Sequence, residues 1–304
     1  MFIALHKSKQ FLAPLIKFII VVICAYALYS QWQDRSINTD IIWATIKTLP
    51  FYTLPLMIAI SMLSWMVESK KWQYLINDLY LLRFRESVTQ NLTAQAASFI
   101  TPFRTGEFAV KSLYYNKFLR KNILSRILAG NTSQMVITTI LGVIGLLFYL
   151  KKNLEIESVF LLLFTVTLLC LLAVTLTLWV LKKWDSGSMS KATWFSTLFY
   201  SLLRYLVFSS NWLLILLLLD NDSSILIMIR NITIFYLAVS IIPVFQLFDI
   251  AIKWTVATYI FTETFHNSEI IIITTTLIWF TNSIVPTVLG CLLLPFQKLK
   301  TVKE

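Results

Sequence analysis

Hydrophobic positions in this chain gather into long runs that polar positions rarely interrupt. A helix that crosses the hydrocarbon core of a bilayer needs about 20 apolar residues. The run at 159–181 carries no charged residue, whereas a soluble helix of that length would need a polar face. The pattern predicts an all-α, polytopic membrane helical bundle whose full spans are 13–31, 46–67, 127–150, 158–181, 192–219 and 270–293.

Two further apolar regions, 87–115 and 224–261, are broken rather than continuous. Pro102 interrupts the first and Pro243 the second. Proline lacks an N–H group and disfavours helix at the residue before it. We expect each region to be a re-entrant hairpin, one entering from each face. The chain would then be a single integral membrane domain, 1–304, with an inverted pseudo-repeat. Pairs of full crossings remain an alternative, although 87–101 is short for a span.

Composition and charge agree with a membrane protein. The chain is 58% hydrophobic and 13% charged, whereas soluble domains are about 25% charged. The net charge is +11, and Lys and Arg concentrate in the segments that are cytoplasmic if the N-terminus is inside. The positive-inside rule therefore predicts that both termini are cytoplasmic. Basic residues that flank spans ordinarily set topology and contact anionic lipids, so we expect no nucleic-acid partner.

The segments that follow the two prolines share a short pattern. Residues 107–111 read "EFAVK" and residues 249–253 read "DIAIK". Both run acidic, apolar, Ala, apolar, basic, and the i,i+4 spacing places the two charges on one helix face. This arrangement is typical of inverted-repeat transporters, in which the N-terminal ends of broken helices point at an anionic substrate near the midplane.

Charged side chains at membrane depth are candidates for function, because each costs about 2.5 kcal/mol or more there. Gly106 is expected to relax the backbone between the break and the next helix. The candidate lipid headgroup-binding residues are Arg104, Gly106, Glu107, Lys111, Arg204, Arg230, Asp249 and Lys253. Basic residues outnumber acidic ones in this set, which suits a phosphate-bearing ligand.

Simpler structural roles remain open for these residues. Glu107 and Lys111 could form a local ion pair that holds the hairpin together. Lys253 could extend to the outer interface. Arg204 and Arg230 could bond to carbonyl groups that are freed at the breaks.

Motifs for other functions are missing from the sequence. It contains no Gly-rich phosphate loop and no nucleophile elbow, and His6 and His266 stand alone. The three cysteines lie inside predicted spans, which is typical of buried apolar side chains rather than disulfides: Cys24, Cys170 and Cys291. We therefore predict no catalytic residue, no metal and no cofactor.

The segment "ITPFRTGEFAVKSLYY" resembles the signature of the lysylphosphatidylglycerol synthase transmembrane-region family. In that family a Pro, a basic residue, Gly-Glu and a following basic residue mark the first broken region; they correspond here to Pro102, Arg104, Gly106, Glu107 and Lys111. A second family feature is a Pro followed by Gly-rich sequence and an acidic residue. Pro243 and Asp249 are present, but "VFQLF" replaces the glycines.

The resemblance implies a flippase-like bacterial inner-membrane protein that moves or binds lipids with a phosphate headgroup. Its expected partners are membrane phospholipids or lipid-linked intermediates, with aminoacylated and polyprenyl-linked lipids both open. The chain ends soon after "KLK", so we expect no soluble aminoacyltransferase domain and no lipid synthesis.

Two alternatives to transport remain open. One is a membrane enzyme that acts on a lipid-linked phosphate, with Glu107 and Asp249 as acid and base. The other is a non-transporting accessory subunit of an envelope glycosyltransferase complex. Association with itself or with other envelope-synthesis proteins is also left open.

Overall fold

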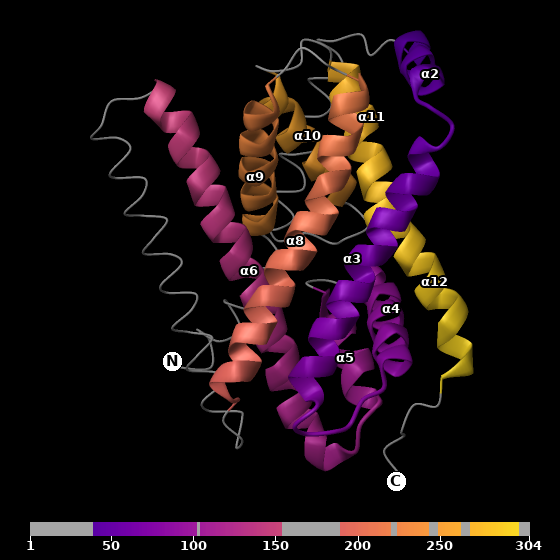
Figure 1. Ribbon diagram of the computed structural model, residues 1–304. Helices are drawn as coiled ribbons and strands as arrows, with labels where there is room; N and C mark the ends of the chain where they lie inside the picture. Colours follow the sequence, from indigo (N-terminus) through magenta and orange to yellow (C-terminus); the bar gives the residue numbers. More distant parts are fainter. Residues whose placement is uncertain are drawn as a thin grey trace, which may run out of the picture.

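The computed structural model describes residues 39–101, 104–153, 189–219, 224–242, 249–262 and 268–297. In these ranges all regular structure is helical, which confirms the predicted all-α membrane bundle (Figure 1). The predicted spans 13–31 and 158–181 lie outside the described residues, as do Pro102 and Pro243. The principal helices are α2 (Thr39–Thr48), α3 (Thr53–Ile76), α4 (Phe84–Ile100), α5 (Thr105–Leu113), α6 (Lys117–Asn153), α8 (Lys191–Leu219), α9 (Ile225–Ile241), α10 (Asp249–Phe261), α11 (Ser268–Trp279) and α12 (Val285–Leu293).

Three helical stretches of the described chain are long and apolar enough to cross a membrane. They are Lys117–Leu150, Lys191–Leu219 and Ser268–Phe296, and they contain the predicted spans 127–150, 192–219 and 270–293. The predicted span 46–67 is wrong at both ends. It takes in the end of α2 and the turn that follows, and α3 continues to Ile76.

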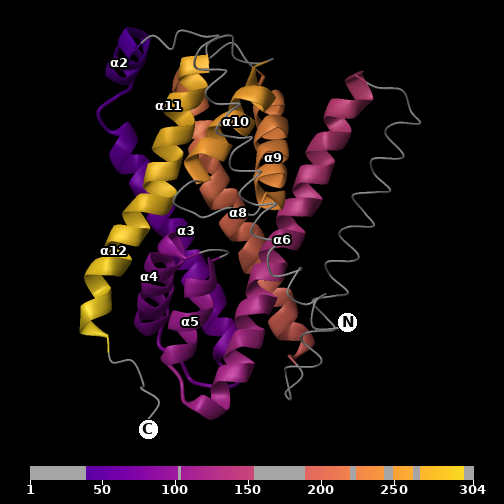
Figure 2. The same ribbon diagram turned by 180° about the vertical axis from the view of Figure 1, so that it is seen from behind.

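The two broken regions form short helical pairs at opposite ends of the bundle. In both views α4 and α5 lie side by side at one end, whereas α9 and α10 lie at the other (Figures 1 and 2). With 9 and 13 residues, α5 and α10 are roughly 14 and 20 Å long, too short for a hydrocarbon core of about 30 Å. The described helices therefore support re-entrant hairpins over paired full crossings.

The backbone at the first break is set by Thr101, Arg104 and Gly106. The Thr101 hydroxyl donates to the Ala97 carbonyl (2.9 Å) and accepts from the Gly106 N–H (2.8 Å). Arg104 has a left-handed backbone, with φ 56° and ψ 28°, and no described glycine has a positive φ. A Cβ on Gly106 would lie 2.4 Å from the Ala97 carbonyl carbon and oxygen. The expectation that Gly106 relaxes the backbone is therefore wrong: Gly106 allows α5 to pack closely on α4.

Helices α11 and α12 are joined without interruption by a π-turn at Phe280–Ile284. Side chains of α3 bond to the main chain of this turn. The Ser61 hydroxyl donates to the Thr281 carbonyl (2.8 Å), and Trp65 Nε1 donates to the Asn282 carbonyl (3.4 Å). These two hydrogen bonds hold the turn in a fixed position against α3. Single π-helical turns inside α-helices occur frequently at functional sites.

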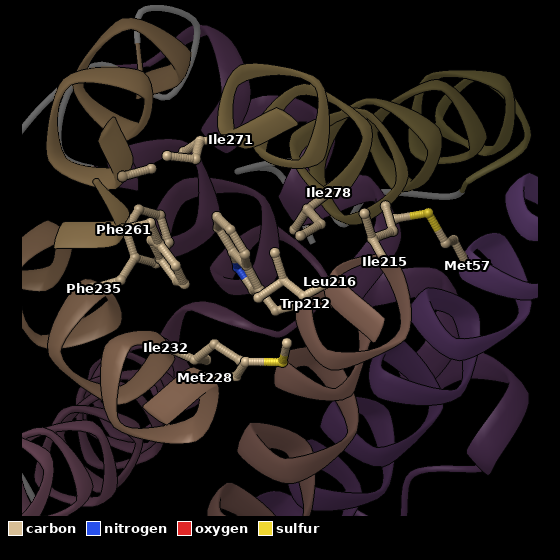
Figure 3. Packing of buried hydrophobic residues seen from close by; sticks show 11 residues of the cluster. Met57, Trp212, Ile215, Leu216, Met228, Ile232, Phe235, Phe261, Ile271 and Ile278 are labelled. Carbon is tan, nitrogen blue, oxygen red and sulfur yellow. The ribbon is translucent and has the colours of Figure 1, made fainter. Parts of the chain in front are cut away.

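Aromatic packing fixes the second hairpin against its neighbours. The ring of Trp212 from α8 stacks on Phe261 from α10, with centroids 5.0 Å apart, and meets Phe235 of α9 edge to face at 4.8 Å (Figure 3). Such contacts contribute about 0.5–1.5 kcal/mol each beyond the area they bury. A second cluster holds the first hairpin between α3 and α6; its buried members are Trp72, Leu75, Ile76, Leu82, Tyr115, Ile123, Ile127 and Ala129.

Candidate lipid headgroup site

One cavity of about 470 Å³ reaches residues of both hairpins. Arg104, at the start of α5, lines it from the first hairpin, and Asp249 and Lys253, at the start of α10, line it from the second. Arg204 of α8 lines it as well. Four residues that are far apart in the sequence, and that were predicted as site residues, are therefore brought to one space.

A group of charged side chains adjoins this cavity through Arg104 and Arg204. The two arginines also line a second, much smaller space together with Glu68 and Glu107. That space has a volume of about 10 Å³, roughly the room that one water molecule needs. The arginines thus connect the cavity with the buried carboxylates of the bundle.

Glu107 and Lys111 form a buried ion pair on α5. The carboxylate Oε1 lies 2.8 Å from Lys111 Nζ, and the two residues are only 6% and 2% exposed. Asn131 Nδ2 donates to the other carboxylate oxygen (3.3 Å), and the Lys111 ammonium lies 4.2 Å from the centroid of the Trp72 ring. The pair holds α5 against α3 and α6, in agreement with the structural interpretation of these residues.

Glu68 of α3, which lines the small space, and its partner Lys71 were not among the residues predicted from the sequence. Glu68 Oε2 lies 2.7 Å from Lys71 Nζ and 3.0 Å from Arg204 Nη1. The predicted span 46–67 ends before both residues, yet Lys71 is 1% exposed. A signal was available, because Trp65, Glu68 and Trp72 continue one helical face by i,i+3 and i,i+4 steps.

The two arginines predicted at membrane depth have different surroundings. Arg204 pairs with Glu68, and its guanidinium lies 5.4 Å from the centroid of the Trp65 ring. Arg230 instead donates to the Asn231 side-chain oxygen from Nε (3.0 Å) and Nη2 (2.9 Å), and lies 5.1 Å from the Tyr149 ring centroid. Arg230 does not line the cavity, so the structure does not bring it to the other candidates.

The second hairpin repeats the ion pair of the first. Asp249 Oδ2 lies 2.5 Å from Lys253 Nζ, and each side chain is 19% exposed. As with Glu107 and Lys111, the acidic residue stands in the first turn of the hairpin's second helix and the lysine four residues later. The shared sequence pattern is thus a shared structural arrangement, buried in one hairpin and open to the cavity in the other.

The charges that line the cavity give it a positive excess. Arg104, Arg204 and Lys253 are basic, and Asp249 is the acidic residue among the lining side chains. Arg104 donates to Gln95 Oε1 across a long 3.5 Å contact and forms no ion pair with the described residues. Within those residues there is also no group of His, Cys, Asp and Glu side chains that could hold a metal ion. The cavity can therefore attract an anionic group.

Comparison with known proteins identifies the family of the chain. A family model described as the lysylphosphatidylglycerol synthase TM region matches residues 15–260. The match includes both hairpins and both ion pairs on their second helices. No curated protein matches the sequence. The family model covers more than half of the chain, and the chain therefore belongs to the lysylphosphatidylglycerol synthase transmembrane-region family.

Proposed function

We propose that this protein is an inner-membrane lipid translocase or lipid-binding transporter for a phosphate-bearing lipid, with both termini in the cytoplasm. Its family ties it to lipid handling in a membrane. The observation that carries the proposal is the single cavity that reaches the start of α5 and the start of α10. Because the two hairpins enter from opposite ends of the bundle, a headgroup in this cavity would be accessible to residues of both halves.

The first half of the site would bind the phosphate through two guanidinium groups. Arg204 is held in place by Glu68 and Trp65, whereas Arg104 is exposed and forms no ion pair with the described residues. Arginine is well suited to bidentate phosphate binding. One fixed and one adjustable arginine would let the site close on a phosphate without first breaking a strong ion pair.

The second half would receive the phosphate at Lys253. Its ammonium is paired with Asp249 at the cavity wall, so an arriving phosphate competes with this carboxylate. Lys253 would then stay paired, with the phosphate in place of the carboxylate, and a phosphate that is paired with a cation costs less to move through the membrane. The headgroup would pass between Arg104 and Lys253 while its acyl chains stay in the lipid.

A reconstitution experiment tests the proposal. The protein is incorporated into vesicles that contain a trace of phosphatidylglycerol labelled on its acyl chain, and dithionite added outside bleaches the label that reaches the outer leaflet. We expect inner-leaflet label to be bleached in vesicles that contain the protein. Arg104→Gln should slow the movement about tenfold or more, because one charge-assisted phosphate contact is worth about 1.5–3 kcal/mol.

Arg230→Gln is the matched control, because it removes a guanidinium at membrane depth that does not line the cavity. This variant should move the lipid within about twofold of the wild-type rate, a change of less than 0.5 kcal/mol. If wild-type vesicles bleach no faster than empty vesicles, the protein is not a translocase for this lipid. If Arg104→Gln is as fast as wild type, the arginine does not bind the headgroup.

A further inference from the structure

We propose that the π-turn at Phe280–Ile284 sets the orientation of Arg204 through Trp65, and that Trp65 is therefore a positioning residue of the headgroup site. This inference rests on the proposed function, in which Arg204 binds the phosphate of the lipid, and it gives the π-turn a role in that site. It follows from the contacts of one face of α3, which reaches both the turn and the arginine.

The π-turn determines how the Trp65 ring is rotated. Ser61 Oγ donates to the Thr281 carbonyl at 2.8 Å and fixes the turn against α3. One helical turn further along α3, Trp65 Nε1 donates to the Asn282 carbonyl at 3.4 Å. An indole N–H can only donate, so the Asn282 carbonyl selects the side-chain rotation of Trp65 that points this group at the turn.

The ring that is fixed in this way holds Arg204. The guanidinium lies 5.4 Å from the centroid of the Trp65 ring, and Trp65 is 9% exposed. A guanidinium over an aromatic ring keeps the N–H groups in its own plane for hydrogen bonds. Glu68 Oε2 lies 3.0 Å from one of its nitrogens, Nη1, and Arg204 also lines the cavity. The ring and the carboxylate thus orient the arginine before a phosphate arrives, which reduces the entropy lost on binding.

A contact from α8 joins the arginine's own helix to the same turn. Asn211 Nδ2 donates to Asn282 Oδ1 at 3.5 Å. Asn211 follows Arg204 by about two helical turns and lies on the same face of α8. The π-turn therefore contacts both the helix that carries Arg204 and the tryptophan that holds its guanidinium. This arrangement makes the turn a fixed point from which the arginine is oriented.

A double-variant cycle tests the inference. The measured quantity is the affinity of the purified protein for dihexanoyl-phosphatidylglycerol, determined by titration calorimetry. Arg204→Gln should weaken binding about tenfold or more, and Trp65→Phe, which keeps a ring but has no N–H, about three- to tenfold. The double variant should bind within about twofold of Arg204→Gln alone, because a residue that acts through Arg204 has no effect once the arginine is gone.

The outcomes separate the inference from the proposed function. Losses that multiply in the double variant would overturn the inference, and so would a Trp65→Phe protein that binds like wild type. If the wild-type protein does not bind this lipid, or if Arg204→Gln binds as tightly as wild type, the proposed site fails and the inference fails with it. Binding without movement in vesicles would refute transport and leave the inference standing.

Trp72→Phe is the matched control for the loss of a tryptophan. Trp72 is a buried tryptophan of the same helix, with Lys111 Nζ 4.2 Å from its ring centroid and an indole N–H that donates to Gln90 Oε1 at 2.8 Å. It does not line the cavity. Trp72→Phe should therefore bind the lipid within about twofold of wild type. An equal loss of affinity in Trp72→Phe and Trp65→Phe would contradict the inference.

A second pair of variants tests the π-turn without changing Trp65 or Arg204. Ser61→Ala removes the hydroxyl that fixes the turn and should weaken lipid binding about two- to threefold. Ser61→Thr keeps a hydroxyl and should restore the affinity of the wild type. Wild-type affinity in Ser61→Ala would overturn the role of the turn, whether or not Trp65→Phe folds.

Discussion

Among Glu68, Lys71 and Arg204, the loss of the Glu68 carboxylate should lower the free energy of unfolding the most. One of its oxygens binds both Lys71 and Arg204, at 2.7 and 3.0 Å. Glu68→Gln keeps the shape of the side chain but removes the charge that compensates these two cations. Lys71 is 1% exposed, so its ammonium would stay buried without a carboxylate beside it.

The expected loss in the free energy of unfolding follows from this geometry. Removing one partner of a buried ion pair costs about 3–5 kcal/mol, and Glu68→Gln should fall in that range. Arg204→Gln should cost less, about 1–3 kcal/mol, because the Arg204 side chain is 17% exposed and Glu68 keeps Lys71. The double variant Glu68→Gln with Lys71→Met should recover most of the loss, since buried ion pairs can be replaced by neutral groups at little cost.

The assay is equilibrium unfolding in mixed micelles, followed by tryptophan fluorescence as the denaturing detergent is increased. Lys70→Met is the control, because Lys70 is only half-buried and donates to the neighbouring Gln73; it should cost less than about 1 kcal/mol. A loss below about 1 kcal/mol for Glu68→Gln would refute the argument. So would a double variant that is no more stable than Glu68→Gln alone.

Further predictions concern the two hairpins and their orientation. Gly106→Ala should destabilise the protein and stop lipid movement, because its Cβ would lie 2.4 Å from the Ala97 backbone; Gly130→Ala should be milder, because its Cβ would meet the movable Leu75 side chain at 3.0 Å. An active, stable Gly106→Ala protein would disprove the close packing. Lys253→Gln should slow phosphatidylglycerol movement as Arg104→Gln does, and an unchanged rate would confine the site to the first hairpin. A cysteine at position 117 should react with an impermeant thiol reagent from the cytoplasmic side of the membrane; labelling from outside would reverse the proposed topology.

Local patterns in the sequence predicted the hairpins and the placement of two opposite charges on one face of the second helix of each. The prolines marked both breaks, and the i,i+4 spacing placed Glu107 beside Lys111 and Asp249 beside Lys253, as the structure shows. These features depend on residues within one or two helical turns of each other. Such short-range geometry is the part of a membrane fold that a single sequence specifies most directly.

Contacts between distant helices could not be predicted in the same way. Arg204 and Arg230 stand in similar apolar surroundings in the sequence, and the rotation of each helix in the bundle decides which one lines the cavity. Glu68 was missed because its partner Arg204 lies 136 residues away, and because paired charges lower the hydropathy of a helix without exposing it. The left-handed backbone lies at Arg104 rather than at a glycine, and the glycine at position 106 instead permits the close packing of α5 on α4.

The most direct test of the account is an experimental structure of the protein in nanodiscs that contain phosphatidylglycerol. The account predicts a lipid phosphate in the cavity between the hairpins, within ion-pair distance of Arg104 or Arg204 on one side or of Lys253 on the other. A cavity without lipid, with the phosphates of bound lipids confined to the surface of the bundle, would contradict it.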